Sequence, residues 1–204
     1  MSAHTGDRSI KVENTMADKL NVITIVGSLR KASYNAALAR QLPKWAPEGM
    51  TISEAPHWAD LPIYNADDQA ATGFPATAVK LADAVRAADG VIFVTPEYNY
   101  GIPGGLKNAI DWVSRMKEQP FIGKPVAIQS VTGGPLGGGR MQYHLRQACV
   151  FLDALAFTKP EIFVGNAPSK FDEKTLEFKD EAGIKFIIQQ LAGFEKFIRK
   201  LGGK

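Results

Sequence analysis

A nearly continuous apolar run, Val22-Ile23-Thr24-Ile25-Val26, leads directly into the polar segment Gly27-Ser28-Leu29-Arg30-Lys31-Ala32-Ser33-Tyr34-Asn35. This pattern predicts a buried strand that ends in a small, hydroxyl-rich loop and then feeds a helix. A helix start offers free backbone N–H groups, to which Ser28, Ser33 and Asn35 add side-chain donors and Arg30 adds a fixed cation. The segment therefore predicts a site for the phosphate of a nucleotide-like cofactor. The alternative is a simple N-cap at Ser33 beside a solvated Arg30.

Strand-like and helix-like periods alternate along the rest of the chain, which predicts parallel βα units. Strands are expected at residues 22–26, 50–55, 90–95, 125–129 and 161–164. Helices are expected at residues 35–45, 74–88, 103–117, 140–157 and 180–201. Five strands and five helices in this order predict an α/β fold with a three-layer, doubly wound sheet. Residues 56–74 remain as one long connection, which is either functional or a plain surface excursion.

The chain has 204 residues, a length that suits one α/β domain. Residues 20–204 are predicted to form that single domain. Residues 1–19 are predicted to be a disordered N-terminal extension, because the start of the chain is polar and lacks turn or periodicity cues. It also lacks the apolar segment of a secretory signal, and no run approaches the ~18 apolar residues of a membrane helix. The single cysteine, Cys149, excludes an internal disulfide and makes the cytoplasm the predicted compartment.

Composition and missing motifs exclude several classes of function. The net charge of +3 is too small to predict nucleic-acid binding, and no Cys/His cluster has the spacing of a metal site. G-x-G-x-x-G does not follow the first strand, and neither G-x-x-x-x-G-K-[ST], H-E-x-x-H nor G-x-S-x-G occurs. His144 is expected to lie at an interface or on the surface, and Cys149 to be a small packing residue.

Three loops are expected to meet at one edge of the sheet, because ligands of an open parallel sheet bind beyond the carboxyl ends of its strands. The first is residues 28–35. The second, residues 95–105, combines proline and glycine with two tyrosines around Asn99, which suits a flat aromatic ligand. The third, residues 130–140, offers free backbone donors that suit negative charge on a reduced ring system. Each loop alone is compatible with ordinary turn chemistry, but all three follow successive apolar strands.

Four motifs, taken together, resemble those of one enzyme family. They are Gly27-Ser28-Leu29-Arg30-x-x-Ser33-x-Asn35, Thr95-Pro96-Glu97-Tyr98-Asn99-Tyr100, Pro103-Gly104-x-Leu106-Lys107-Asn108-Ala109-Ile110-Asp111-Trp112 and Ser130…Gly133-x-x-x-Gly137-Gly138-x-Arg140. In these residues the chain resembles the NAD(P)H-dependent FMN reductase family, and within it the quinone reductase and chromate reductase branch. The resemblance covers residues 20–200. It departs from the family pattern at Ala32, where glycine is common, and at Thr132-Gly133-Gly134-Pro135, where the loop varies.

This resemblance implies a flavodoxin-like fold with strand order 2-1-3-4-5 and a tightly bound, non-covalent FMN. The implied contacts to the FMN phosphate are Ser28, Arg30, Ser33 and Asn35, with a backbone amide from Ala36. The implied lining of the isoalloxazine and the ribityl chain is Pro96, Glu97, Tyr98, Asn99 and Tyr100, and the implied contacts at the far edge of the ring are Ser130, Gly133 and Gly134. The implied reaction passes a hydride from NAD(P)H to the flavin and then reduces a quinone or another small acceptor, including chromate and other metal oxyanions. No protein side chain needs to act as an acid or a base.

Two helices also predict a homodimer or a homotetramer. The helix at residues 140–157 carries, besides its core stripe, a second line made of Tyr143, Gln147, Val150, Ala154 and Phe157. A helix that is apolar on two sides is either buried in a core or shared with a partner. Trp112, beside the core stripe of its own helix, has the same interpretation. Arg140, Tyr143 and Glu161 are expected to form polar contacts at this interface.

Two other functions compete with the enzyme. One is a flavodoxin-like electron carrier without turnover of its own, although carriers present an acidic face to their partners and this chain is mildly basic. The other is a flavin-binding sensor or scaffold. Steady consumption of NADPH with a quinone, and with no added reductase, distinguishes the enzyme from both.

Overall fold

The structure is a computed structural model that describes residues 18–202, so the extension expected at residues 1–19 lies almost entirely outside the described residues. Its strands form one parallel sheet in the order β2-β1-β3-β4-β5, with β6 paired to β4 as well. The strands are β1 (Leu20–Val26), β2 (Met50–Glu54), β3 (Gly90–Val94), β4 (Pro125–Val131), β5 (Leu155–Ala156) and β6 (Ile162–Val164). This order confirms the flavodoxin-like α/β fold. The division into an extension and a single domain stays a prediction.

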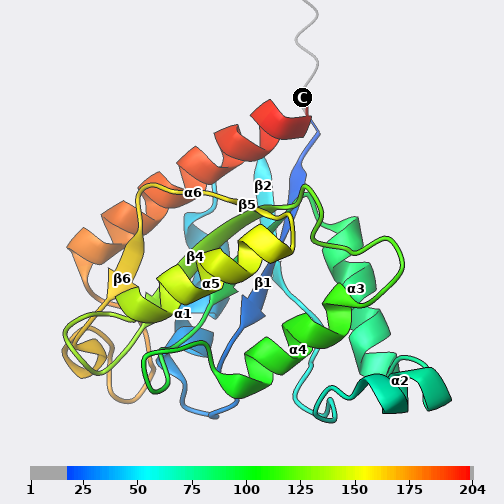
Figure 1. Ribbon diagram of the computed structural model, residues 1–204. Coiled ribbons are helices and arrows are strands. Elements are labelled where there is room, and N and C mark those ends of the chain that lie inside the picture. The colour runs from blue at the N-terminus through cyan, green and yellow to red at the C-terminus, as the bar shows by residue number, and fades with distance from the viewer. Residues whose placement is uncertain (1–17, 203–204) are drawn as a thin grey trace, which may run out of the picture.

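Helices cover both faces of the sheet and make three layers (Figure 1). They are α1 (Tyr34–Gln41), α2 (Ala66–Thr72), α3 (Ala76–Ala87), α4 (Gly104–Ser114), α5 (Gly139–Phe151) and α6 (Glu181–Gly202). One apolar core joins α3, α4 and α5 to the sheet, and a second joins α1 and α6 to its other face. Because both faces are covered, every residue of β3 and β4 is buried, as their continuous apolar runs predict. No helix among the described residues is both long and apolar enough to cross a membrane.

The strand expected at residues 161–164 is present as β6, but a further short strand, β5, lies where the preceding helix was expected to continue. The helix expected to continue to residue 157 ends at Phe151, and Asp153 then adopts a left-handed backbone with a φ of 51°. Glycine usually occupies this conformation at the end of a helix, because other residues adopt it with a steric penalty. Here the residue is an aspartate, so the sequence lacks the usual signal for the end of the helix. The released residues form β5, which pairs with Pro125 and Val126, while β6 pairs with residues 129–131 of the same strand β4.

The long connection at residues 56–74 also differs, because it contains the additional helix α2. Asn65 caps this helix by accepting a hydrogen bond from Asp67 N at 2.9 Å, and Gly73 ends it with a φ of 79°. The connection is fastened to α4, since Pro62 O accepts hydrogen bonds from Asn108 Nδ2 and Trp112 Nε1, both at 2.8 Å. Asn65 followed by two aspartates is a helix-start signal that the sequence analysis missed.

The strand register brings three loops to one edge of the sheet. Val26 in β1 is level with Val94 in β3, and Val94 is level with Gln129 in β4. The three expected loops therefore leave neighbouring strands at nearly the same height, where a ligand of this fold binds.

Candidate functional site

A cavity of ≈ 410 Å³ lies where these three loops meet, and its volume is within the range of small-molecule sites. Eight of the thirteen residues expected to hold the cofactor line it: Ser28, Arg30, Ser33, Asn35, Pro96, Glu97, Tyr98 and Gly133. Tyr34, Val131, Thr132 and Pro168 line it as well, and the sequence analysis did not select them. Pro168 lies in the short 3-10 helix Ala167–Ser169 directly after β6. Pro168 could have been predicted as a lining residue because it follows the carboxyl end of a strand, as the three loops do.

The first loop has the geometry of an anion site. Ser33 is the N-cap of α1 and accepts a hydrogen bond from Ala36 N at 3.3 Å. The N–H groups of Tyr34 and Asn35, in the first turn, have no hydrogen-bond acceptor within residues 18–202. Among residues 18–202, Arg30 is the only lysine or arginine that lines the cavity, and its Nη2 donates to Ala32 O at 2.6 Å. Free helix N–H groups beside a cation are what a phosphate group needs.

The side-chain amide of Asn35 and the backbone N–H of Ala36 are already hydrogen-bonded within the chain. The Asn35 side chain is 4% exposed, and its amide exchanges two hydrogen bonds with the backbone of Val131, from Nδ2 to the carbonyl at 2.8 Å and to Oδ1 from the N–H at 2.9 Å. Asn35 therefore ties the first loop to the end of β4, and only its backbone N–H is left for an anion. The N–H of Ala36 is bonded to Ser33, and Ala36 does not line the cavity.

The second loop ends in a tight turn that projects from the site. Tyr98 and Gly101 exchange two backbone hydrogen bonds, at 2.9 and 3.1 Å. Asn99 and Tyr100 between them have φ values of 48° and 70°, as a type I′ turn requires. Both side chains lie at the tip and do not line the cavity, whereas Tyr98 does. Asn99 and Tyr100 thus lie outside the lining of this cavity, and their contacts with the flavin stay a prediction.

Glu97 joins the second loop to the third through an ion pair with Arg140. It also accepts a hydrogen bond from Met141 N, in the first turn of α5, at 3.2 Å. Burial alone would raise the pKa of Glu97, but the Arg140 guanidinium and the Met141 N–H outweigh it and hold the pKa below its usual value. The same guanidinium lies over the Tyr100 ring, 3.5 Å from its centre, and so fixes the turn.

In the third loop, Gly133 lines the cavity but Ser130 and Gly134 do not. Ser130 is fully buried, and its hydroxyl is bonded to Gly137 O and to Gln142 Nε2. Gly134 is exposed, and an added Cβ there would meet no atom within 4 Å. The third loop therefore offers backbone, and not the Ser130 hydroxyl, to the cavity.

A family model described as NADPH-dependent FMN reductase matches residues 20–169. The chain belongs to this family. It is 52% identical to a quinone reductase of Escherichia coli (strain K12) over 91% of this chain and 99% of that protein. It is 44% identical to an NAD(P)H-dependent FMN reductase of Pseudomonas aeruginosa over 92% of this chain and 100% of that protein. Among solved structures, the flavoenzyme FerB, an NAD(P)H:(acceptor) oxidoreductase from Paracoccus denitrificans, matches with a TM-score of 0.78 and 32% identity, over 89% of this chain and 98% of that one.

Membership in the NADPH-dependent FMN reductase family confirms the family predicted from the loop motifs. It confirms as well that the protein is an enzyme, with FMN and NAD(P)H as its cofactors. The role of each lining residue toward FMN stays a prediction.

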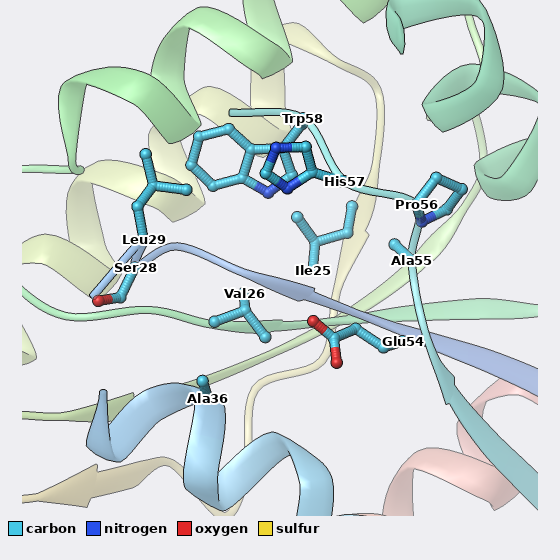
Figure 2. A pocket seen from close by; sticks show the side chains of 10 residues that line it. All are labelled: Ile25, Val26, Ser28, Leu29, Ala36, Glu54, Ala55, Pro56, His57 and Trp58. Atoms are coloured by element: carbon cyan, nitrogen blue, oxygen red, sulfur yellow. The ribbon is translucent and has the colours of Figure 1, made fainter. Parts of the chain in front are cut away.

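A smaller pocket of ≈ 130 Å³ adjoins Ser28 on the β2 side (Figure 2). Glu54, His57 and Trp58 lie around it, and Trp58 is buried whereas the other two are exposed. Its volume is below the ~300 Å³ of typical ligand sites, so the larger cavity is the candidate for the cofactor of this FMN reductase.

The surface predicted for a partner is only partly present in the isolated chain. Trp112 is 1% exposed and packs edge-on against Tyr64, so its role is within its own chain and the interpretation as a partner contact is wrong. Phe157 packs against Phe194 and does not continue the line along α5. Tyr143 and Val150 are exposed, at 57% and 81%.

Cys149 is buried, as expected of a packing residue. Burial raises the pKa of its thiol to about 11, so the protonated form, which is a poor nucleophile, predominates at neutral pH.

We expect Glu97→Gln to lower the free energy of unfolding, and to lower it more at pH 6 than at pH 3.5, when the variant is compared with the wild type at the same pH. Because the folded-state pKa of Glu97 lies below its unfolded value, the carboxylate stabilises the fold above the unfolded pKa, and this contribution is lost as the pH falls through the folded pKa. Urea unfolding at both pH values measures the difference. The exposed Glu173→Gln is the control, because it makes the same substitution on the surface of the protein. An equal loss of stability at both pH values would contradict the ion-pair explanation.

Proposed function

We propose that this protein oxidises NAD(P)H and reduces quinones, with FMN held in the ≈ 410 Å³ cavity. The single observation that carries the proposal is the convergence of three strand-end loops on one cavity that has an anion site at one side and open glycine backbone at the other. The names of the relatives, quinone reductase and NAD(P)H-dependent FMN reductase, support quinones as acceptors.

The residues present fit an FMN group. The N–H groups of Tyr34 and Asn35, with Arg30 and Ser28, suit the phosphate. Tyr98 and Pro96 suit a flat ring, and the exposed backbone of Gly133 suits its hydrogen-bonding edge. When bound, FMN supplies the redox chemistry, accepting a hydride from NAD(P)H and giving electrons to the acceptor. The protein binds and orients the group, and the Asn35 and Glu97 ties hold the three loops in place around it.

The test is to purify the protein, record its visible spectrum, and titrate it anaerobically with NADPH with and without benzoquinone. We expect a flavin spectrum that is bleached by NADPH and restored by the quinone, with steady consumption of NADPH. Bleaching without turnover would support the electron carrier, and bound FMN that does not react with NADPH would support the sensor. A protein that binds no FMN when it is supplied in excess would contradict all three.

Two finer parts of the proposal concern acceptors and assembly. We include chromate and other metal oxyanions as acceptors, since an exposed flavin reduces many small oxidants, and reduction of chromate by the purified enzyme tests this. We also propose a homodimer or homotetramer through the face of α5 that carries Tyr143 and Val150, because these exposed side chains lie two helical turns apart on one face, and apolar surface gathered on one face marks an interaction site. Analytical ultracentrifugation tests the assembly, and a monomer would contradict it. The cytoplasm stays the predicted compartment.

A further inference from the structure

The glycine-rich segment at residues 132–138 passes over the carboxyl end of β4 and is anchored at both of its ends. At the first end, Val131 exchanges two hydrogen bonds with the Asn35 amide, accepting from Nδ2 and donating to Oδ1. At the second end, the carbonyl of Gly137 accepts a hydrogen bond from Ser130 Oγ at 2.5 Å. Thr132 and Gly133, which line the cavity, lie between these anchors. Between the anchors, Thr132 N donates to Val164 O at 2.9 Å and Asn166 N donates to Gly134 O at 3.1 Å, so the end of β6 and the residues after it also hold both neighbours of Gly133. Because glycine backbone is flexible by itself, these ties determine where this part of the cavity wall lies.

Gln142, on α5, controls the second anchor through Ser130. Its side chain is fully buried, and its Nε2 donates hydrogen bonds to Ser130 Oγ and to Ile162 O, both at 2.8 Å. Since the Ser130 hydroxyl accepts from Gln142, its single hydrogen is free to be donated to Gly137. The carbonyl of Ile162 can only accept, so the amide must place its NH2 group on this side. Gln142, Ser130 and Gly137 therefore form one directed chain of hydrogen bonds.

The amide of Gln142 has a cost that an apolar side chain of the same size would not have. Its Oε1 is buried and has no hydrogen-bond partner within residues 18–202. An unpaired buried acceptor destabilises the folded state. The stabilising contribution of the amide is its two hydrogen bonds, to Ser130 and to Ile162 in β6.

The backbone of the glycine-rich segment packs closely against Ser130 and β6. Gly138 has a φ of 87°, and a Cβ on it would lie 2.8 Å from Ser130 Cβ. Gly137 has a φ of 60°, and a Cβ on it would lie 2.7 Å from the carbonyl carbon of Phe163 in β6. A shift of Ser130 is therefore transmitted to Gly137 and Gly138. Gln142 also holds β6 through Ile162 O, and the end of β6 is bonded to Thr132, the residue before Gly133.

We propose that Gln142, which does not line the cavity, is a positioning residue for FMN: through Ser130 and β6 it sets the place of the Gly133 backbone against the flavin. The inference rests on the proposed function, since it takes the cavity to be the FMN site. Hydrogen bonds from the backbone to the ring of a flavin set its affinity and its reduction potential. Both properties should therefore respond to Gln142.

Gln142→Met tests this inference, because methionine keeps the length of the side chain and removes its donors. The dissociation constant of FMN is measured by quenching of flavin fluorescence, and the reduction potential of the bound flavin by equilibration with a reference dye. We expect FMN affinity to fall about fivefold or more and the potential to shift from the wild-type value. Ser130→Ala removes the middle of the hydrogen-bond chain with less change in volume, and we expect the same two effects from it.

Gln190→Met is the matched control. Gln190 is also a buried glutamine, 2% exposed, but it bonds Gln129, two residues before the end of β4, and the carbonyl of Pro160, and not the glycine-rich segment. We expect it to lower the stability of the apoprotein while FMN affinity and potential stay at wild-type values. If Gln142→Met and Ser130→Ala bind FMN with wild-type affinity and potential, Gln142 is structural only and the inference is wrong. Failure of the wild type itself to bind FMN would instead overturn the proposed function, and the inference with it.

Discussion

Arg30→Ala is expected to weaken FMN binding by roughly 10- to 150-fold, the range for loss of a hydrogen bond to a charged group. In the part of the chain that the structure describes, Arg30 is the only lysine or arginine that lines the cavity, and the N–H groups of Tyr34 and Asn35, which line it too, have no acceptor there. Its guanidinium is already oriented by the hydrogen bond to Ala32 O and lies 5.9 Å from the centre of the Tyr34 ring. A preoriented cation loses less entropy when it binds a phosphate. Titration of the apoprotein with FMN measures the effect.

Lys31→Ala is the control for Arg30→Ala, because Lys31 is the neighbouring exposed cation and does not line the cavity. Loss of one positive charge from the loop is common to both variants, so any difference between them reports contact with the phosphate. Arg30→Lys should recover part of the affinity, since it keeps the charge without the planar pair of donors. Equal weakening by Arg30→Ala and Lys31→Ala would refute a specific phosphate contact and leave only a general electrostatic attraction. The thermal stability of the apoprotein should not change, because Arg30 is exposed.

The sequence predicted the layers of this fold because its central strands are covered on both faces. Burial on two sides requires the continuous apolar runs that form β1, β3 and β4, and such runs are visible without a structure. The position at which α5 ends could not be predicted from the pattern of apolar residues. It depends on Asp153 in a left-handed conformation, and β5 is only two residues long and is defined by its pairing with β4.

The site was predicted from patterns within single segments. It differs from the prediction where a side chain is bonded to a residue far away in the sequence. Ser33 as an N-cap and Arg30 as the cation follow from their own neighbours in the sequence. The Asn35 amide, in contrast, is engaged by Val131, 96 residues away, and Glu97 is bonded to Met141, 44 residues away. No pattern within one segment indicates such a pairing. The side chains expected to touch the cofactor thus include two that hold the loops together.

Gly27→Ala is expected to destabilise the protein by about 3 kcal/mol, the upper part of the range for overpacking a core. Gly27 directly follows β1, and its N–H donates to Val94 O at 3.0 Å, so the ends of β1 and β3 are already joined. A Cβ on Gly27 would overlap Thr95 Oγ1 and lie 2.5 Å from Thr95 Cβ and 3.0 Å from Leu106 Cδ2. Thr95 is fully buried and its N–H is bonded to Gln129 O, so it cannot move aside. A melting temperature lower by roughly 6–12 °C is the expected result for a chain of this size.

Gly104→Ala and a second substitution at Thr95 show whether the clash itself is responsible. A Cβ on Gly104 would meet no atom within 4 Å, and the residue begins α4, so its stability should change by less than about 0.5 kcal/mol. Thr95→Ala removes the hydroxyl that the new Cβ overlaps. The double variant should therefore lose less free energy of unfolding than the two single variants lose together. Strict additivity would mean that Thr95 is not what requires glycine here. Since Ser28 follows Gly27 directly, a clash at this point also displaces the first residue of the anion site, and the same variant should lose FMN along with stability.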